Sequence, residues 1–420
     1  MKELFPIHRA LCGPGFLDSL RRVQKRLPIE IAEFPSGSKS FDWVIPKEFK
    51  VNEAYVENAQ GDRVLDFKHC NYHVWNYSQP FDGVLDREEL VKHISTLPVL
   101  PDAVPWRFAY YRPKWGLSAS EQQVKALPPG QYHVRIDTEF REGALRIGQY
   151  YLAGDTDREI MITSYLCHPR GANDNLSGVV ISTELFKLLA QLPRRRFSYR
   201  LAIWPETIGS VTYIANYPER LKKVVGGYVI LCAGDPGKFH YKASIEGNSL
   251  IDRAAAHALR HSGSPYEVRP YVHHQGSDEC QFNSIGVRLP FGCIMRTPPG
   301  EFPQYHSSAD DLEFVRPEAL QGTLEVYWNA LMAIERAVTY RGRFTVDPFL
   351  TGYGIYPFDH GAGEGQIGNA MAVAYYHLMG GIDGQTDLLA LADRVNLPIH
   401  VFDRAVQDFL RADLMSQVGA

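Results

Sequence analysis

Two side chains of the kinds that bind zinc lie close together in the sequence. His168 comes three residues after the apolar run Glu159–Tyr165, and Asp174 lies just ahead of a helical pattern that begins near Asn175. Parallel α/β folds place ligand sites at the carboxyl ends of their strands, so this imidazole and this carboxylate are candidate metal ligands. The alternative is a polar core role for His168 and a capping role for Asp174.

Two later segments add groups with related chemistry. Glu206 follows the apolar run 199–204, and its carboxylate could deprotonate a metal-activated water molecule, bind the metal, or only stabilise a helix N-terminus. His306 lies in a turn-rich loop ahead of a long helical pattern. Asp310 or Asp311 could fix the tautomer of His306 or cap that helix.

Three further carboxylates give weaker signals. Asp278 and Glu279 follow a Gly-Ser turn, and Asp235 follows a strand-like segment that ends at Cys232. Single residues of these kinds are ambiguous, because a structural role explains each of them. Their order along the chain, at the ends of successive strands, favours one metal site.

The elements that must position these residues alternate between strand and helix from residue 130 onward. Hydrophobic periodicity predicts strands at 132–140, 144–152, 159–165, 199–204, 227–232 and 286–293, and helices at 175–189, 208–217, 250–261 and 317–338. This alternation is typical of an α/β fold with a mixed, mainly parallel sheet. The Glu142-Gly143 pair indicates that the first two strands form a hairpin.

Composition and breaker residues divide the chain into three parts. Residues 1–40, with an amphipathic helix at 15–26, and residues 117–340 are expected to form the catalytic core. Residues 41–116 contain short β-prone segments broken by Pro46 and by Gly61-Asp62, which predicts a small β-rich inserted domain. A boundary near 340–347 separates a C-terminal module at 345–420.

The C-terminal module has a helix-turn-helix pattern. Helical segments are predicted at 369–379, at 387–394 with Thr386 as its cap, and at 399–410. Residues 345–420 hold nine acidic and three basic side chains. Because phosphate contacts dominate nucleic-acid affinity, we expect this module to contact protein, to support homo-oligomerisation or to act as a lid rather than to bind DNA.

The composition of the whole chain excludes several classes. With a net charge of −4 and no apolar run of about 18 residues, the protein is expected to be cytoplasmic, with no transmembrane helix and no attraction to anionic membranes. The N-terminus lacks the apolar segment of a secretory signal. The six cysteines contain no CxxC pair, which predicts reduced core thiols.

Taken in order, these motifs resemble the M28 superfamily of zinc aminopeptidases. More closely, nearly the whole chain resembles the aminopeptidase-like family DUF4910 (with DUF2172). The resemblance rests on the strand-borne His168, on Glu206 ahead of Gly209-Ser210, and on the segments 172–178, 277–279 and 305–310, with further similarity at 36–53 and 110–116. It implies a three-layer αβα zinc-exopeptidase-like core and a C-terminal winged-helix domain.

The resemblance also implies roles for the ligand candidates. His168 and His306 correspond to the histidine ligands, and Asp174 to the aspartate that can bridge two metal ions. Glu206 matches the acidic element that contains the general base. M28 enzymes typically carry a Glu-Glu pair there, whereas this chain has Glu206-Thr207.

That departure affects the expected number of metal ions. It favours one zinc ion with Glu206 as general base, and it leaves open a second ion with Asp235 as a ligand. Asp278 and Glu279 are expected to bind the free α-amino group of a substrate.

We therefore expect a zinc-dependent hydrolase of amide or peptide bonds, aminopeptidase-like and acting on a small peptide or amide. Three protein ligands leave a position open for a water molecule, which Glu206 would deprotonate. Two alternatives stay open: deacylation or cyclisation on the same scaffold, and a non-catalytic metal-containing binding or regulatory protein. The presence of Glu206 beside the ligand set favours an enzyme.

Overall fold

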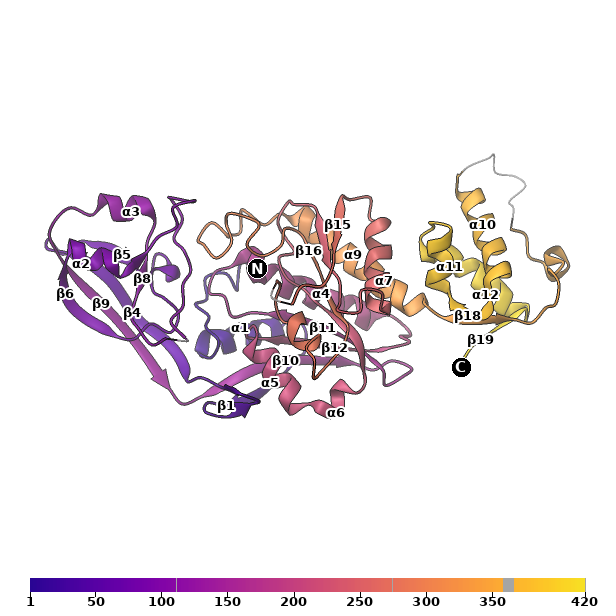
Figure 1. The fold of residues 1–420 in the computed structure, drawn as a ribbon, viewed down its shortest axis with the longest axis horizontal. Helices are drawn as coiled ribbons and strands as arrows, with labels where there is room; N and C mark the ends of the chain where they lie inside the picture. Colours follow the sequence, from indigo (N-terminus) through magenta and orange to yellow (C-terminus); the bar gives the residue numbers. More distant parts are fainter. Residues whose placement is uncertain (111, 274, 358–365, 420) are drawn as a thin grey trace. The chain divides into compact units, whose positions relative to one another are not determined.

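The computed structural model describes residues 1–110, 112–273, 275–357 and 366–419 (Figure 1). The chain forms two compact units. The larger unit comprises Met1–Glu246 and Glu267–Leu324, and the smaller unit comprises Gly247–Tyr266 and Glu325–Ala420. Every candidate residue for the metal site lies in the larger unit.

A mixed eight-stranded sheet forms the centre of the larger unit. Its order is β1 (Glu30–Pro35), β10 (Ala144–Leu152), β12 (Ser198–Trp204), β11 (Glu159–Tyr165), β13 (Val224–Val229), β16 (Phe291–Met295), β14 (Phe239–Lys242) and β15 (Tyr266–Arg269). Strands β12, β11, β13 and β16 run parallel, whereas β1 with β10, β10 with β12, and β14 with β16 pair antiparallel. The predicted mixed α/β sheet is confirmed, but it is parallel only at its centre.

The central strands are apolar along their whole length because both of their faces are covered. All seven residues of β11 and all seven of β12 are buried, as expected for parallel strands inside an α/β fold. Helices α1 (Pro14–Gln24), α4 (Gly178–Gln191) and α5 (Ile208–Asn216) pack against the sheet. The remaining helices of this part are α6 (Pro218–Leu221), α8 (Glu279–Phe282) and the first turns of α9 (Pro317–Arg336), whose residues from Glu325 onward belong to the smaller unit.

A second sheet lies at one end of the larger unit (Figure 1). It is antiparallel, in the order β5 (Arg63–Asp66), β4 (Glu48–Asn58), β9 (Gln131–Arg141) and β6 (Phe81–Asp86). The shorter elements around it are β2 (Lys39–Ser40), β3 (Trp43–Val44), η1 (Asn71–His73), α2 (Arg87–Lys92), β7 (Ile94–Ser95), β8 (Leu117–Ser118) and α3 (Glu121–Ala126). Strand β9 lies outside the expected limits of the insert, 41–116, although it is central to this sheet.

The hairpin predicted for 132–140 and 144–152 is wrong. Both strands exist, as β9 and β10, but β9 pairs with β4 and β6, whereas β10 pairs with β1 and β12. An alternation of apolar and polar side chains predicts a strand but does not predict which strand it pairs with. The turn at Glu142-Gly143 therefore carries the chain from one sheet to the other.

The smaller unit combines helices with a three-stranded antiparallel sheet. The sheet order is β18 (Asp383–Asp387), β17 (Thr339–Gly342) and β19 (Met415–Gln417). The helices are α7 (Leu250–Arg260), η3 (Leu350–Tyr353), α10 (Gln366–Gly381), α11 (Leu388–Arg394), η4 (Ile399–Phe402) and α12 (Asp403–Arg411). The expected helix-turn-helix elements are therefore present, while their identity as a winged helix stays a prediction.

Helix α7 is tied to the C-terminal segment by polar contacts. Arg253 forms an ion pair with Asp387 at 2.6 Å, and Nδ1 of His257 lies 2.7 Å from the carboxylate of Asp393. Asp387 caps α11 by accepting the N–H of Ala390, so the assignment of this cap to Thr386 is wrong. Within the described ranges, no helix is both long and apolar enough to span a membrane.

The central strands should dominate the stability of the larger unit. Leu201 of β12 is 0% exposed and lies between Tyr150 and Ile162 on the neighbouring strands. We expect Leu201→Ala to lower the free energy of unfolding by about 2–5 kcal/mol, because it removes methyl groups and leaves a cavity. Urea unfolding followed by tryptophan fluorescence measures this loss. Val84→Ala, at a position 60% exposed in β6, is the control, and equal midpoints for the two variants would contradict the prediction.

Candidate metal centre

His168 is delivered to the site by the end of the central strand. Beyond Tyr165, the N–H of Leu166 still bonds to the carbonyl of Trp204, and the chain then turns to bring His168 inward. The backbone carbonyl of His168 accepts a hydrogen bond of 2.9 Å from Nε of the buried Arg9. The His168 side chain is only 4% exposed, so its position is set by packing on all sides.

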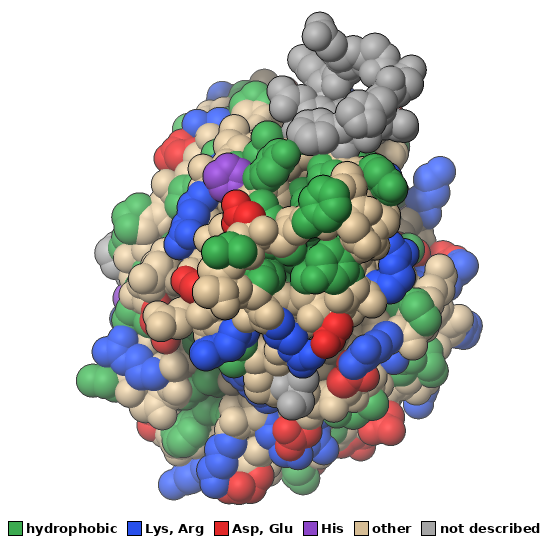
Figure 2. All heavy atoms as spheres, turned by 90° about the vertical axis from the view of Figure 1, so that its right-hand side faces the viewer, with side chains coloured by type: hydrophobic (Ala, Val, Ile, Leu, Met, Phe, Trp, Pro, Cys, Tyr) green, Lys and Arg blue, Asp and Glu red, His purple; other side chains and the backbone are tan. Residues whose placement is uncertain are grey.

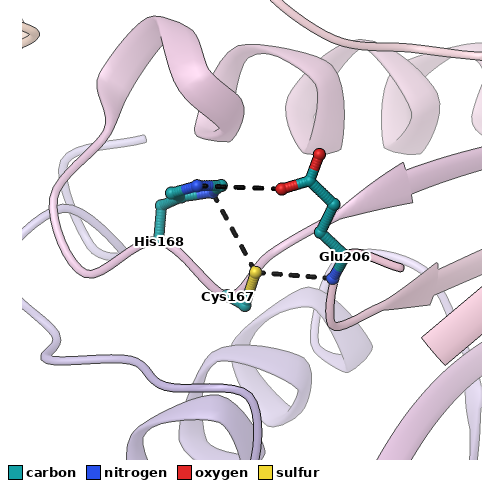
Figure 3. A group of neighbouring side chains, drawn as sticks. All are labelled: Cys167, His168 and Glu206. Carbon is teal, nitrogen blue, oxygen red and sulfur yellow. Dashed lines mark hydrogen bonds and ion pairs between the residues drawn. The ribbon is translucent and has the colours of Figure 1, made fainter. Parts of the chain in front are cut away.

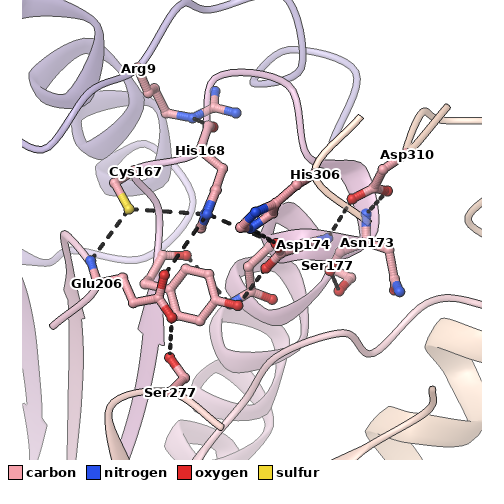
Figure 4. Close-up of polar contacts among 12 residues, drawn as sticks. Arg9, Cys167, His168, Asn173, Asp174, Ser177, Glu206, Ser277, His306 and Asp310 are labelled. Atoms are coloured by element: carbon pink, nitrogen blue, oxygen red, sulfur yellow. Dashed lines mark hydrogen bonds and ion pairs between the residues drawn. The ribbon is translucent and has the colours of Figure 1, made fainter. Parts of the chain in front are cut away.

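Asp174 lies in the irregular turn η2 (Ala172–Ser177) that leads into α4. The carboxylate of Asp310 accepts the backbone N–H groups of Asn173 at 2.6 Å and of Asp174 at 2.9 Å. The hydroxyl of Tyr165 donates to Oδ1 of Asp174, and the Asp174–Asn175 peptide bond is cis. These contacts leave Oδ2 of Asp174 directed at the two histidines (Figure 4).

His306 reaches the site from a loop that follows β16. Its backbone has a left-handed φ of 54°, and its carbonyl accepts the N–H of Trp106 at 2.7 Å. The imidazole stacks on Tyr305, with ring centroids 3.8 Å apart. The prediction that Asp310 or Asp311 contacts this ring finds no support: Asp310 binds the η2 turn, and Asp311 accepts the N–H groups of Glu313 and Phe314.

The three side chains form a group suited to a cation. Nε2 of His306 lies 3.1 Å from Oδ2 of Asp174, and Nε2 of His168 lies 3.9 Å from the same oxygen. Both Oδ2 of Asp174 and Nε2 of His306 are buried, and neither has a hydrogen-bond partner among the described residues. Buried polar atoms are normally satisfied. Ligand-type atoms that converge without a donor between them fit a metal ion with nitrogen and oxygen ligands.

Glu206 lies beside this group, at the end of β12. Its Oε2 is 3.8 Å from Nε2 of His168, and its Oε1 accepts a hydrogen bond of 2.7 Å from the hydroxyl of Ser277. Its backbone N–H points to Sγ of Cys167 at 3.4 Å (Figure 3). Thr207, in a left-handed conformation with φ 64°, turns the chain directly after it. Glu206 is thus held at its backbone and at one carboxylate oxygen.

Asp278 and Glu279 are engaged by protein donors. Asp278 accepts hydrogen bonds from Nε1 of Trp204, from the N–H of Thr207 and from Oγ of Ser210, at 2.6–2.8 Å. Glu279 is 0% exposed and pairs with Lys242 at 2.7 Å. Asp278 therefore supports the turn that carries Glu206. These contacts speak against direct binding of a substrate amine, which stays an untested prediction.

Asp235 is also engaged by protein donors. Its carboxylate accepts hydrogen bonds from Nδ2 of Asn173, from the N–H of Gly237, and from both the N–H and the hydroxyl of Thr297. It belongs to neither of the two potential metal-binding groups in the described part of the chain, which are His168, Asp174 and His306, and Cys167, His168 and Glu206.

Burial is the main cause of the pKa shifts in this site. Burial lowers the pKa of His168 to about 4. Burial alone would raise the pKa of Asp174, but His168 and His306 outweigh it and hold that pKa at about 2. Burial and the nearby carboxylates of Asp174 and Asp278 raise the pKa of Glu206 well above its ordinary value. A divalent cation would favour the charged carboxylates and the neutral imidazoles.

A pocket of about 250 Å³ opens onto these residues. We call it the metal pocket; His168, Glu206 and His306 lie in its wall. Five aromatic side chains form much of the rest: Trp43, Tyr77, Trp106, Phe108 and Tyr110. The ring of Trp106 packs edge-on against His168 and His306, with centroid distances of 4.5 and 4.6 Å. Glu206 is the one carboxylate among the described residues that line this pocket.

Comparison of the sequence with known proteins shows the family to which the chain belongs. The sequence model of the domain of unknown function DUF4910 matches residues 1–337. A protein of Clostridium acetobutylicum, named "Putative polysaccharide biosynthesis protein with aminopeptidase-like domain", is 36% identical over 419 residues, which cover 100% of this chain and 95% of that protein. The chain belongs to the DUF4910 family.

Solved structures extend the comparison of this DUF4910 protein. The crystal structure of a "putative peptidase" from Clostridium acetobutylicum is 35% identical, with a TM-score of 0.90 over 99% of this chain and 94% of that one. A zinc aminopeptidase from Bacillus subtilis is 14% identical, with a TM-score of 0.56 over 77% of this chain and 90% of that one. A peptidase M28 precursor from Shewanella amazonensis is 12% identical, with a TM-score of 0.57 over 83% and 93%. The last two show a shared fold, and the predicted likeness to M28 peptidases is confirmed at that level.

Several residues of the site carried no usable signal in the sequence. Trp106 and Phe108 lie in an irregular, Pro-rich segment that has no hydrophobic periodicity. Ser277 is a common residue in a turn, and Arg9 lies near the N-terminus, far from the motifs. Cys167 was adjacent to His168, which was the one available clue to its place.

The role of Asp310 in orienting the η2 turn can be tested by comparing a substitution of Asp310 with the same substitution of its neighbour Asp311. We expect Asp310→Asn to weaken zinc binding by about 10–100-fold, because outer contacts that orient ligands typically have this effect and an amide cannot accept both N–H groups as a carboxylate does. Competition with a chromophoric chelator measures the affinity. Asp311→Asn, which alters a carboxylate that bonds only within its own turn, is the matched control. Unchanged affinity in Asp310→Asn would refute the assignment.

Proposed function

We propose that this DUF4910 protein is a zinc-dependent hydrolase of amide bonds. The observation that carries the proposal is the convergence of His168, Asp174 and His306 beside the carboxylate of Glu206. Two of the buried ligand atoms have no hydrogen-bond partner among the described residues. The fold shared with zinc aminopeptidases supports an amide as the bond that is cleaved. Because a fold alone does not define a reaction, the reaction is inferred from the residues of the site.

The ligand set fits the chemistry of zinc. Two imidazoles and one carboxylate are the kind of three-ligand site that catalytic zinc uses with a further position left open. When bound there, zinc would supply a Lewis acid that polarises the scissile carbonyl group and acidifies water. Asp235 is surrounded by protein donors, which supports a single zinc ion over two.

Glu206 is the proposed general base. Its Oε2 faces the ligand group and would take a proton as the water oxygen bonds to the acyl carbon. The same oxygen would then return the proton to the nitrogen as the carbon–nitrogen bond breaks. Ser277 and Cys167 hold the side chain and backbone of Glu206 in place for both transfers.

The substrate can be an aminopeptidase substrate or another amide. The fold supports the former, and a specific observation favours the latter: Asp278 and Glu279, the acids expected to bind a free α-amino group, are engaged by Trp204, Thr207, Ser210 and Lys242. A deacylase is therefore the second candidate. A protein with a purely structural metal would not require Glu206 at this position.

For the C-terminal module we propose a winged helix that contacts protein. Strands β17, β18 and β19 with helices α10, α11 and α12 supply the elements of such a domain. The acidic composition of residues 345–420 disfavours nucleic acid. On the face drawn in Figure 2, Lys and Arg side chains are interspersed with Asp and Glu rather than gathered in one patch. A second copy of the chain is one partner that a size measurement in solution would reveal.

The proposed reaction is tested by separating metal binding from proton transfer. We expect purified protein to contain zinc, and a His168→Ala/His306→Ala double variant to lose it. Glu206→Gln should retain zinc but lose about 10²–10⁴-fold in kcat, because the amide cannot accept the proton. Elemental analysis and turnover of a panel of aminoacyl and N-acyl amides provide the two measurements. Zinc retained in the double variant, or full turnover in Glu206→Gln, would defeat the proposal.

A further inference from the structure

A second, larger hollow lies next to the metal pocket in the larger unit. Its volume is about 600 Å³, and we call it the distal hollow. Most of its wall is apolar, including Val211, Ile214, Leu221, Val224, Val287 and Leu289. Asp42 and Lys222 are the ionisable groups among its described lining residues. A wall of this kind suits an uncharged aliphatic group.

Two structural elements run from the metal pocket to the distal hollow. Trp43 of β3 lines both. Helix α5 lines both as well, through Ile208 in the metal pocket and through Val211 and Ile214 in the distal hollow. Those positions are six residues apart at most, which is about 9 Å along a helix. The two spaces are therefore neighbours along α5, and they share Trp43 in their walls.

The hairpin that carries Trp43 is anchored on the same helix. Strand β2 contacts α5, and Oγ of Ser40 lies 3.3 Å from Oγ1 of Thr212. Phe41, which turns the hairpin with φ 57°, is 65% exposed and also lines the distal hollow. A group that leaves the metal pocket past Trp43 thus meets apolar side chains from the hairpin on one side and from α5 on the other.

The charged residues in and near the metal pocket also favour a substrate whose acyl group has no positive charge. Among the described lining residues of the metal pocket, Glu206 is the one carboxylate, and it is assigned to proton transfer. Asp278 and Glu279 are buried and paired with protein donors. A substrate with a free ammonium group beside the scissile carbonyl would find no second acid in this wall. An acyl group without that charge meets no such cost.

We propose that the substrate is an N-acyl amine whose acyl group is an aliphatic chain, held with its carbonyl at the metal pocket and its chain past Trp43 in the distal hollow. This assignment rests on the proposed amide hydrolysis and specifies its substrate. Water adds its oxygen to the acyl carbon, the carbon–nitrogen bond breaks, and the products are the aliphatic carboxylic acid and the free amine. The combined space of the two pockets is of the size that proteins use for small ligands.

The test is a chain-length series measured on the zinc-loaded full chain. Amides of one amine with acetyl, butanoyl, hexanoyl, octanoyl and decanoyl groups should show kcat/KM rising about fourfold for each buried methylene group, then levelling off once the hollow is full. Aminoacyl amides of the same amine should be poorer substrates than the longer acyl amides. A flat series, or faster turnover of the aminoacyl amides, would overturn the assignment while leaving amide hydrolysis intact.

A single glycine offers a way to fill the hollow. Gly286 lines it, and an added Cβ there would meet nothing within 4 Å. Gly286→Trp should abolish the gain with chain length and leave the acetyl amide unaffected. Gly380→Trp is the matched control, because Gly380 of α10 also has open space around its Cβ and lies in the smaller unit. If Gly286→Trp does not fold, Leu221→Trp fills the hollow from α6. An unchanged chain-length gain in the folded variant would overturn the proposal.

A binding measurement makes the result independent of turnover. Calorimetry with the hydroxamic acids of the same chain lengths should show affinity for the zinc-loaded protein rising with length, and Gly286→Trp should remove the rise. If no amide is hydrolysed but this rise is present, the proposed hydrolysis fails and the assignment of the hollow to an aliphatic chain holds. If affinity does not change with length, the assignment fails, whatever the enzyme hydrolyses.

Discussion

Burying an ionised carboxylate costs several kcal/mol unless charges and donors compensate it, and Asp174 is 1% exposed. Much of the surrounding structure supplies that compensation. Tyr165 donates to one oxygen, two histidines approach the other, and Asp310 binds the backbone that carries the residue. Asp310 is itself buried, with its pKa raised to about 8 chiefly by burial. The centre is thus a set of acids and imidazoles that a divalent cation would complete, since its charge offsets the burial of the acids.

The sequence could predict the position of the site residues that directly follow the central strands. The runs that became β11 and β12 are apolar throughout because both faces of these strands are covered. His168 and Glu206 follow them directly, so their placement at one edge of the sheet was predictable. His306 was a candidate because of its residue type, and the resemblance implied its role as a ligand, since the periodicity of a turn-rich loop does not predict where its side chains lie. In the structure, the three predicted ligands His168, Asp174 and His306 lie within reach of one another.

What could not be predicted depends on contacts between distant segments. Strands β9 and β10 have the patterns of a hairpin, yet each finds another partner, because pairing is decided by neighbouring strands and not by alternation alone. Asp278 and Glu279 looked available because charged residues after a turn are usually exposed. Their partners, Trp204 and Lys242, lie 74 and 37 residues away. Trp106 and Phe108 of the pocket wall belong to no motif, since they lie in an irregular segment of the chain.

The hydrogen bond between Trp106 and His306 has a consequence for how the proposed metal site would form. The third ligand is held by the backbone of a segment 200 residues earlier, through the N–H of Trp106 and a bridge between Pro105 and Ser307. During synthesis, His168 and Asp174 leave the ribosome well before His306, and a two-ligand site binds zinc weakly. If the protein binds zinc as proposed, metal loading would therefore be a late event that requires the loop of His306 to dock, and a chain that stops short of residue 306 would lack the third ligand.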